Sequence, residues 1–145
     1  MELYTPEGKY NYVAYLLADE NSISIKVAKY DLIENEEYRY CSLIKATDRI
    51  LDKLKVENKT LARITDKKRI QKNIIDATAL REAVINAIVH NDYSEELSPV
   101  IKIYEDKIVV TSYGGLLSGQ TEEDFFSCMS MPRNRELMRV FRDLN

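Results

Sequence analysis

ALREAVINAIVHNDY, from Ala79 to Tyr93, is the stretch around which the rest of the chain is organised. Taken as a helix, it places apolar residues at i, i+3, i+4, i+7 and i+8, namely Leu80, Ala83, Val84, Ala87 and Ile88. This spacing forms one apolar stripe that faces a core. At about 100° per residue, Glu82, Asn86 and Tyr93 fall within roughly 40° of one another on another side. His90 lies one turn beyond Asn86, at the edge of this polar stripe.

The polar stripe supports two interpretations, a partly solvated face of the helix or the wall of a ligand site. An amide oxygen four residues after a carboxylate can hold a magnesium ion, which prefers oxygen ligands and needs few from the protein. A carboxylate one turn earlier can orient or deprotonate an attacking water. The order of Glu82, Asn86 and His90 therefore favours the ligand site.

The segment REAVINAIVHNDYS resembles the signature of a bacterial family with a GHKL-like ATP-binding module. Members of that family are described as RecG-like, ATP-dependent DNA helicase-related proteins or transcriptional regulators, usually with an Alba-like DNA-binding domain upstream. The resemblance implies ATP and Mg²⁺ as ligands, Glu82 as the catalytic base and Asn86 as the metal ligand. It also implies that DNA is contacted only through domains outside this chain, and it makes TPEGKYNYVAYLLAD similar to an interdomain seam.

Length and composition describe one ordinary soluble domain, with 145 residues of which 45% are hydrophobic. The 21 basic and 24 acidic residues give a net charge of -3 without a long run of either sign, which argues against nucleic-acid binding by bulk charge. Cys41 and Cys128 lie far apart and suit buried thiols in a reducing compartment. No apolar run approaches the roughly 20 residues of a membrane helix, and the chain does not start like a signal peptide. We expect a cytoplasmic protein without a membrane partner.

The N-terminal half shows weaker patterns. They predict a short helix within Asn11–Glu20, a strand over Ser22–Lys29, a solvated turn over Glu34–Glu37, a strand around Tyr38 and Tyr40, and a helix from Leu43 to about Val56. Thr60 to Ile75 is ambiguous and could form a hairpin that turns near Asp66. The basic cluster Lys67, Lys68, Arg69 and Lys72 in this segment is either a solvated hairpin tip or a phosphate-facing surface. Asp76 is placed to cap the helix that follows.

The C-terminal half has clearer turn and helix-boundary patterns. Val100–Tyr104 and Lys107–Ser112 predict a hairpin. Thr121 and Asp124 form a capping-box pattern for a short helix over Glu122–Ser127, and the last helix is expected over Arg135–Leu144. Arg133 and Arg135, in MPRNREL, resemble the Arg-Asn motif of the family and either meet phosphates or belong to the surface.

A glycine turn follows the second strand of this hairpin, where Gly114 and Gly115 would allow the backbone to approach a ligand phosphate or base. In the resembled family this turn takes the place of an Asp-x-Gly-x-Gly box whose Asp recognises adenine. Here Ser112 replaces that Asp and Leu116 replaces the second glycine, so the most specific adenine contact is lost.

The same turn has two other interpretations. Gly114-x4-Gly119-Gln120-Thr121 nearly spells a phosphate loop but lacks its lysine, and a simple turn after a hairpin needs no ligand. His90 suits either a hydrogen-bonded structural histidine or a nucleotide contact. The nucleotide contacts implied by the resemblance are Glu82, Asn86, His90, Ser112, Gly114 and Gly115.

These patterns predict an α+β fold: a two-layer sandwich with a mixed or antiparallel sheet, helices mainly on one face, and a partial GHKL (Bergerat-like) topology. We expect a single domain over residues 1–145, comprising a seam (1–20), N-terminal strands and helix (21–75), and a GHKL-like core (76–145) that stops before the second glycine-rich box. The favoured function is an ATP/Mg-binding module of a larger regulator or helicase-related protein, without ATP turnover by this part alone. The alternative is a degenerate, non-catalytic scaffold for interaction or dimerisation. The oligomeric state is open, a homo-oligomer included.

Overall fold

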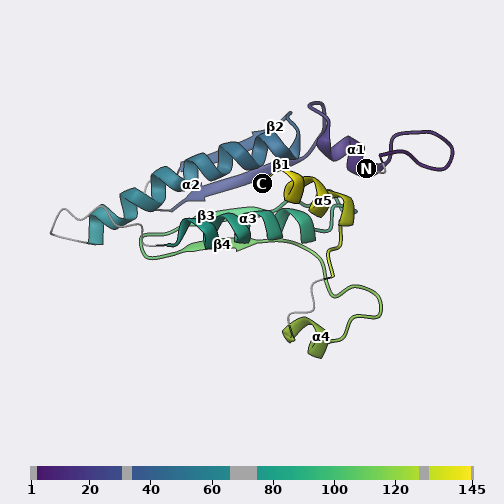
Figure 1. Cartoon of the computed structure of the whole chain (residues 1–145). Coiled ribbons are helices and arrows are strands. Elements are labelled where there is room, and N and C mark those ends of the chain that lie inside the picture. Colours follow the sequence, from purple (N-terminus) through teal and green to yellow (C-terminus); the bar gives the residue numbers. More distant parts are fainter. Residues whose placement is uncertain (1–2, 31–33, 66–74, 128–130, 145) are drawn as a thin grey trace.

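The computed structural model of the chain describes residues 3–30, 34–65, 75–127 and 131–144, with the backbone alone for 59–65. Helices and strands alternate irregularly along it (Figure 1). In chain order they are α1 (Tyr12–Leu17), β1 (Ser24–Lys29), β2 (Glu34–Arg39), α2 (Leu43–Thr65), α3 (Ala77–His90), β3 (Val100–Ile103), β4 (Ile108–Thr111), α4 (Glu122–Phe126) and α5 (Arg135–Asp143). None of the helices described is long and apolar enough to cross a membrane.

The sheet has four strands in the order β2-β1-β3-β4. β1 pairs antiparallel with β2 and parallel with β3, while β3 and β4 form an antiparallel hairpin. The long helices α2 and α3 lie side by side along one face of the sheet (Figure 1). The predicted α+β architecture, with a mixed sheet and helices mainly on one face, is therefore confirmed.

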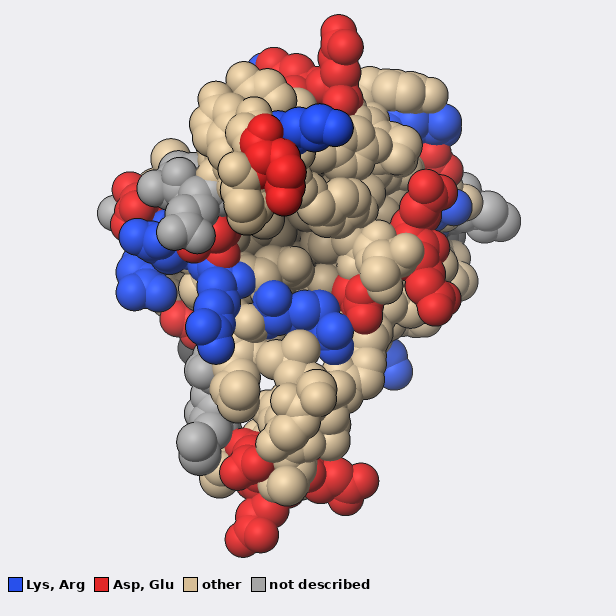
Figure 2. Space-filling model, turned by 90° about the vertical axis from the view of Figure 1, so that its right-hand side faces the viewer, with Lys and Arg blue, Asp and Glu red and all other residues tan. Residues whose placement is uncertain are grey.

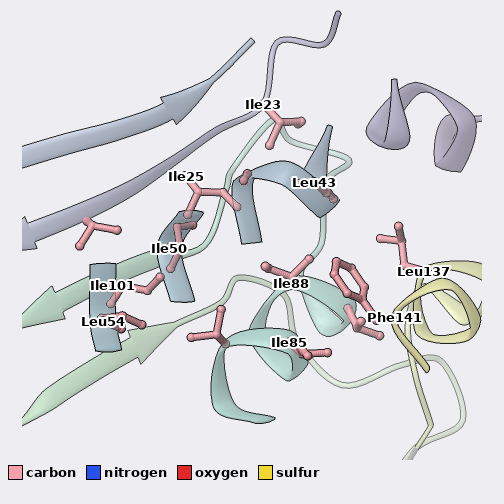
Figure 3. Close-up of a cluster of buried hydrophobic side chains, with 14 of the residues drawn as sticks. Ile23, Ile25, Leu43, Ile50, Leu54, Ile85, Ile88, Ile101, Leu137 and Phe141 are labelled. Atoms are coloured by element: carbon pink, nitrogen blue, oxygen red, sulfur yellow. The ribbon is translucent and has the colours of Figure 1, made fainter. Parts of the chain in front are cut away.

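The core lies between this sheet and its helices. Alternate residues of β1 and β3 point to the helices, with Val27 paired to Ile101 in the parallel register. Figure 3 shows side chains of the strands, of the long helices α2 and α3, and of α5, which pack together around Ile88 of α3. Its fully buried members include Ile25, Leu43, Ile50, Leu54, Ile88, Ile101 and Leu137. A leucine or isoleucine buried to this extent contributes about 1.5–3 kcal/mol relative to an exposed one.

Helix α3 begins and ends at identifiable residues. The Asp76 carboxylate accepts a hydrogen bond from the Ala79 amide at 2.9 Å, which confirms the predicted N-cap. The helix ends at His90, because Asn91 is extended. Tyr93 therefore lies beyond the helix, and its assignment to the polar stripe is wrong. Its ring is 3% exposed and its hydroxyl donates to the Ile88 carbonyl at 3.0 Å.

Two expectations for the N-terminal half are wrong. Glu34–Glu37 is not a turn but the start of edge strand β2, where exposed acidic side chains meet Lys26 and Lys53. Helix α2 continues to Thr65, so a hairpin does not begin at Thr60, because the helical backbone runs through that position. The basic cluster at 67–72 lies outside the described residues.

The C-terminal predictions are confirmed within two residues. The hairpin forms as β3 and β4, the capping box at Thr121 and Asp124 opens α4, and α5 covers Arg135–Asp143. α5 packs beside α3 through Leu137 and Phe141, whereas α4 projects from the body of the molecule (Figures 1 and 3). The segment that contains the glycine turn therefore lies between the core and a projecting helix.

Candidate functional site

A cleft of about 770 Å³ opens between the C-terminal half of α3 and the segment that follows β4. This volume is within the usual range of small-molecule sites. Its polar lining residues include Asn86, His90, Ser112, Tyr113, Gln120 and Arg133. Its apolar lining includes Val110, Leu116, Leu117, Phe125 and Met131.

The cleft contains five of the six predicted nucleotide contacts. Asn86 and His90 line it from α3, and Ser112, Gly114 and Gly115 line it from the opposite side. Glu82 is exposed on α3 and lies outside the lining that the described residues form. It stands one helical turn, about 6 Å along the axis, before Asn86. The roles of all six residues stay predictions.

The end of α3 is fastened to the glycine turn by Asn91, which is 0% exposed. Its Oδ1 accepts from the Tyr113 amide at 2.9 Å, and its Nδ2 donates to the Leu97 carbonyl at 2.7 Å. The Asp92 amide donates to the Tyr113 carbonyl at 2.8 Å. One buried amide side chain therefore holds two loops against one helix end.

A second fastening comes from the segment before α5. Arg133 donates through Nη1 to Asp92 Oδ2 at 3.1 Å and through Nη2 to the Gly115 carbonyl at 2.6 Å. Asn134 donates through Nδ2 to the carbonyls of Val89 at 2.8 Å and Asn91 at 2.9 Å. These carbonyls lie at the end of α3, where the helix itself provides no donors.

The two arginines of MPRNREL lie in different surroundings, and a contact of either with phosphates stays a prediction. Arg133 lines the cleft, whereas Arg135 is exposed and lies outside the lining formed by described residues. Asn134 was not singled out by sequence reasoning. The carbonyls at the C-terminus of α3 require hydrogen-bond donors from outside the helix, and this requirement could have pointed to Asn134. Its amide side chain supplies the donors from a position far along the chain.

Gly114 is required by the geometry of the turn. Its φ of +118° is unfavourable for other residues, and a Cβ at this position would lie 3.0 Å from Arg133 Nη2 and 3.0 Å from Asp92 Cβ. A Cβ on Gly115 would meet no atom within 4 Å. The first glycine therefore permits the close approach of the turn to Arg133, and the second leaves open space at the cleft.

One charged side chain lies in the described lining of the cleft, and it forms an ion pair with Asp92. Arg133 is the only charged residue in the lining that the structure describes. Burial, and then the nearby Arg133 charge, lower the pKa of His90, so its imidazole is neutral at pH 7. Hydrogen bonds from Ser94, together with the Arg133 charge, lower the pKa of Asp92. Figure 2 shows lysine and arginine side chains gathered between the body and the acidic lower end of the molecule, which Figure 1 identifies as α4.

The acidic first turn of α4 disfavours the phosphate-loop interpretation. Glu122, Glu123 and Asp124 stand where a phosphate loop would direct a helix N-terminus at its ligand. The helix is also only five residues long. The start of α4 is therefore unsuited to an anionic ligand.

The residues present suit a metal ion only if a ligand brings it. Among the residues described, no group of three His, Cys, Asp or Glu side chains could hold a metal. Asn86, whose side chain has one amide oxygen, lines the cleft. Mg²⁺ is commonly bound by one or two protein oxygens together with substrate phosphates and water, so a nucleotide would have to supply most of its ligands.

The C-terminal third of the chain is similar to a known protein family. Residues 97–145 match the family model described as "Putative ATP-dependent DNA helicase recG C-terminal". The matched part contains β3, β4, the glycine turn, α4 and α5, and it leaves α3 outside. This third is thus similar to a RecG-related, ATPase-like module.

The comparison of folds covers nearly the whole chain. The crystal structure of the DIP2311 protein from Corynebacterium diphtheriae has the same fold with a TM-score of 0.68 and 20% sequence identity. The likeness covers 97% of this chain and 30% of that one, so the chain spans less than a third of the length of its structural relative. Among curated proteins, none matches.

Proposed function

We propose that the chain is an ATP-binding module that takes its nucleotide with Mg²⁺ in the cleft between α3 and the glycine turn. The observation that supports this function best is the meeting of Asn86 and His90 with Gly114 and Gly115 across one cleft. The RecG-related family match covers the turn side of that cleft. The α3 side carries the residues whose types suit metal and water chemistry.

Each part of the lining has a task in this proposal. The apolar side chains, Val110 and Phe125 among them, suit the faces of a purine. Arg133 supplies positive charge, and the exposed backbone at Gly115 lets phosphates come close. The Asn86 oxygen would hold Mg²⁺, which neutralises phosphate charge when bound. Glu82 would orient an attacking water.

Isothermal titration with ATP in the presence of MgCl₂ tests the proposal. We expect saturable binding that Asn86→Ala weakens about tenfold or more, in line with the loss of a metal ligand or a charge-assisted hydrogen bond. Thr78→Ala is the matched control, because Thr78 is exposed on the first turn of the same helix and away from the cleft lining. Equal affinities of Asn86→Ala and the unchanged chain would count against the assignment.

Within a longer protein we propose a RecG-related regulator or helicase-related enzyme that contacts DNA through other domains. The share of the structural relative that the chain spans, 30%, supports a modular setting. Turnover there would depend on Glu82. Glu82→Gln should retain ATP binding and lose hydrolysis, and a variant that still hydrolyses ATP would remove Glu82 from the role of base.

A degenerate scaffold is the second candidate, and one observation favours it. Arg133 already binds Asp92 and the Gly115 carbonyl, and no carboxylate stands at position 112. In this case the cleft would be part of a protein–protein interface, and the exposed Phe125 and Phe126 of α4 would form its apolar contact surface. Light scattering would then show a dimer that Phe126→Ser dissociates, and titration with ATP would give no heat of binding.

A further inference from the structure

We infer that the face of the sheet turned away from α2 and α3 binds single-stranded DNA (Figure 1). We call it the outer face, and it carries Lys26, Tyr30, Arg39, Lys102, Tyr104 and Lys107. This surface is separate from the cleft, and DNA binding by the chain itself goes beyond the proposed function. Only the choice of DNA over RNA comes from that function, which places the chain in a protein that contacts DNA.

The register of the sheet assigns these side chains to the outer face. Successive side chains of a strand point to opposite faces, and directly paired residues of neighbouring strands share a face. Val27 of β1 and Ile101 of β3 are paired and buried on the helix side, so Lys26 and Lys102 point outward. Arg39 of β2 pairs with the residue two positions before Lys26, and it therefore points outward too.

Two tyrosines and a lysine form a row across one end of the outer face. Tyr30 and Tyr104 directly follow Lys29 and Ile103, the last paired residues of β1 and β3, and their rings stack at a centroid distance of 4.8 Å with 3° between the planes. On the β4 side, Lys107 Nζ lies 5.3 Å from the centroid of the Tyr104 ring. Tyr30, at the other end of the row, is 53% exposed. A DNA base can therefore stack against the Tyr30 ring and extend the row, because every base has a π-face.

The charge of the outer face is complementary to a phosphate backbone. The side chains of Lys26 and Arg39 are 60% and 49% exposed, and both contact Glu37. Among the described strand residues, Glu37 is the one acidic side chain on this face. Lys102 and Lys107 add positive charge from β3 and from the hairpin that follows it. Basic side chains thus outnumber acidic ones here, and the excess of positive charge attracts phosphates.

The other acidic residues of β2 belong to the helix side of the sheet. Glu34 and Glu36 alternate with the outward residues and form ion pairs with Lys53 of α2 at 4.0 and 2.7 Å. Glu105 and Asp106 lie in the hairpin turn, beyond the paired strand residues. A chain with a net charge of -3 therefore has an outer face on which positive charge is in excess.

The dimensions of the outer face and its aromatic row favour a single strand over other partners. Lys26 and Tyr30 lie on one strand at a separation of about 13 Å, at about 3.3 Å per residue. Stacked nucleotides advance about 3.4 Å each, so this length covers about four of them. A duplex keeps its bases paired inside the helix and offers none to Tyr30. Acidic side chains of a peptide do not stack on a ring, and a second copy would bring like charges together.

Fluorescence anisotropy of a labelled thymidine oligonucleotide of about 12 nucleotides, titrated with the full chain in about 50 mM salt, tests the inference. We expect saturable binding that weakens as salt is added. The logarithm of the association constant should fall against the logarithm of the salt concentration with a slope of about -2, as for about three neutralised phosphates of a single strand.

Paired variants assign the binding to the outer face. Tyr30→Ala should weaken binding about fivefold or more, whereas Tyr30→Phe, which keeps the ring, should bind like the unchanged chain. Tyr10→Ala is the control, because Tyr10 is an exposed tyrosine outside the sheet. Lys102→Gln should reduce the salt slope by about 0.7. Lys55→Gln, the same change at an exposed lysine of α2, should leave the slope as it is.

Several outcomes would overturn the inference. The duplex formed with the complementary strand must bind more weakly than the single strand, since equal affinity means that no base stacks. An RNA strand that binds more than about tenfold more tightly overturns the choice of DNA. A dimer in light scattering that Tyr30→Ala dissociates, without DNA binding, assigns the face to a second copy. Absence of binding by a chain that circular dichroism shows to be folded, or unchanged affinity of Tyr30→Ala, overturns the site itself.

Titration with ATP separates these outcomes from those of the proposed function. Tyr30→Ala should bind ATP as the unchanged chain does, because Tyr30 lies outside the cleft lining that the structure describes. DNA binding without ATP binding would overturn the proposed function and support the outer face as a DNA site. ATP binding without DNA binding would do the reverse.

Discussion

Replacing the buried Asn91 by alanine should destabilise the fold strongly and loosen the glycine turn. The substitution removes the acceptor of the Tyr113 amide at 2.9 Å and the donor to the Leu97 carbonyl at 2.7 Å. Asn91 is 0% exposed, whereas its partners Leu97 and Tyr113 are exposed residues and both hydrogen bonds are partly buried, so water relieves part of the loss. An unsatisfied buried polar group costs about 1–3 kcal/mol. Two such groups, less the relief from local rearrangement, give an expected loss of about 2–4 kcal/mol in the free energy of unfolding.

Urea denaturation followed by circular dichroism measures this loss. The midpoint should fall while the slope of the transition stays the same, since the surface exposed on unfolding hardly changes. For a chain of this length, about 1 kcal/mol lowers the melting temperature by roughly 2–4 °C, so a thermal scan should show a clear drop as well.

Asn86→Ala is the matched control, because it makes the same chemical change on an exposed residue of α3, the helix that Asn91 follows. The structure assigns the Asn86 side chain no hydrogen bond within the described part of the chain, so its replacement should change stability by less than about 0.5 kcal/mol. A loss for Asn91→Ala that is as small as that of the control would refute the view that Asn91 fastens the two loops.

Three further predictions concern the turn and the histidine. Gly114→Ala should cost about 1–3 kcal/mol in urea unfolding because of its backbone conformation, whereas Gly115→Ala, which has open space, should cost less than about 0.5 kcal/mol; similar losses would contradict the steric argument. Arg133→Ala should lower stability by about 1 kcal/mol, a modest value for a partly exposed pair, and should weaken ATP binding in titrations more than Arg142→Ala, an exposed control; equal effects on binding would remove Arg133 from the site. His90 is the only histidine and its folded pKa is lowered by burial and then by Arg133, so the unfolded chain binds a proton first as the pH falls. The free energy of unfolding should therefore decrease as the pH falls from about 7 through about 6.5 towards the lower folded pKa. His90→Gln should flatten that part of the pH profile, and an unchanged profile would contradict the burial argument.

Local patterns predicted the elements that local physics determines. The 3.6-residue periodicity of α3, the capping box at Thr121 and the alternation in β1 each depend on residues close in sequence. The same reasoning failed at β2, where Glu34–Glu37 looks like a solvated turn by composition alone. Pairing with the half-buried strand β1 and ion pairs to Lys26 and Lys53 stabilise these acidic residues as a strand. Such tertiary stabilisation is not visible in the segment itself.

The candidate site likewise combines residues that local sequence patterns predict with residues that depend on distant contacts. Helical spacing placed Asn86 and His90 together, and the strand-to-glycine transition placed Gly114 and Gly115 at a turn. The spacing rules could not foresee that Tyr93 would turn back into the core, because the helix ends three residues earlier at a point fixed by contacts with distant segments. They also could not foresee Asn134, which bonds to carbonyls more than forty positions away in the chain.

The cleft is divided between a part of the chain that the family model matches and a part that the model does not cover. The family match begins at residue 97, after α3, so the turn lies inside it while Asn86 lies outside. Asn91 and Asn134 join the two parts, one amide from each side, and both bond to backbone atoms. A ligand that contacts α3 and the turn at once would reinforce the same junction. Ligand binding and the stability of this junction should therefore be coupled, so that a nucleotide raises the melting temperature of the unchanged chain and raises that of Asn91→Ala less. Equal stabilisation of both chains would show that the ligand binds without using the junction.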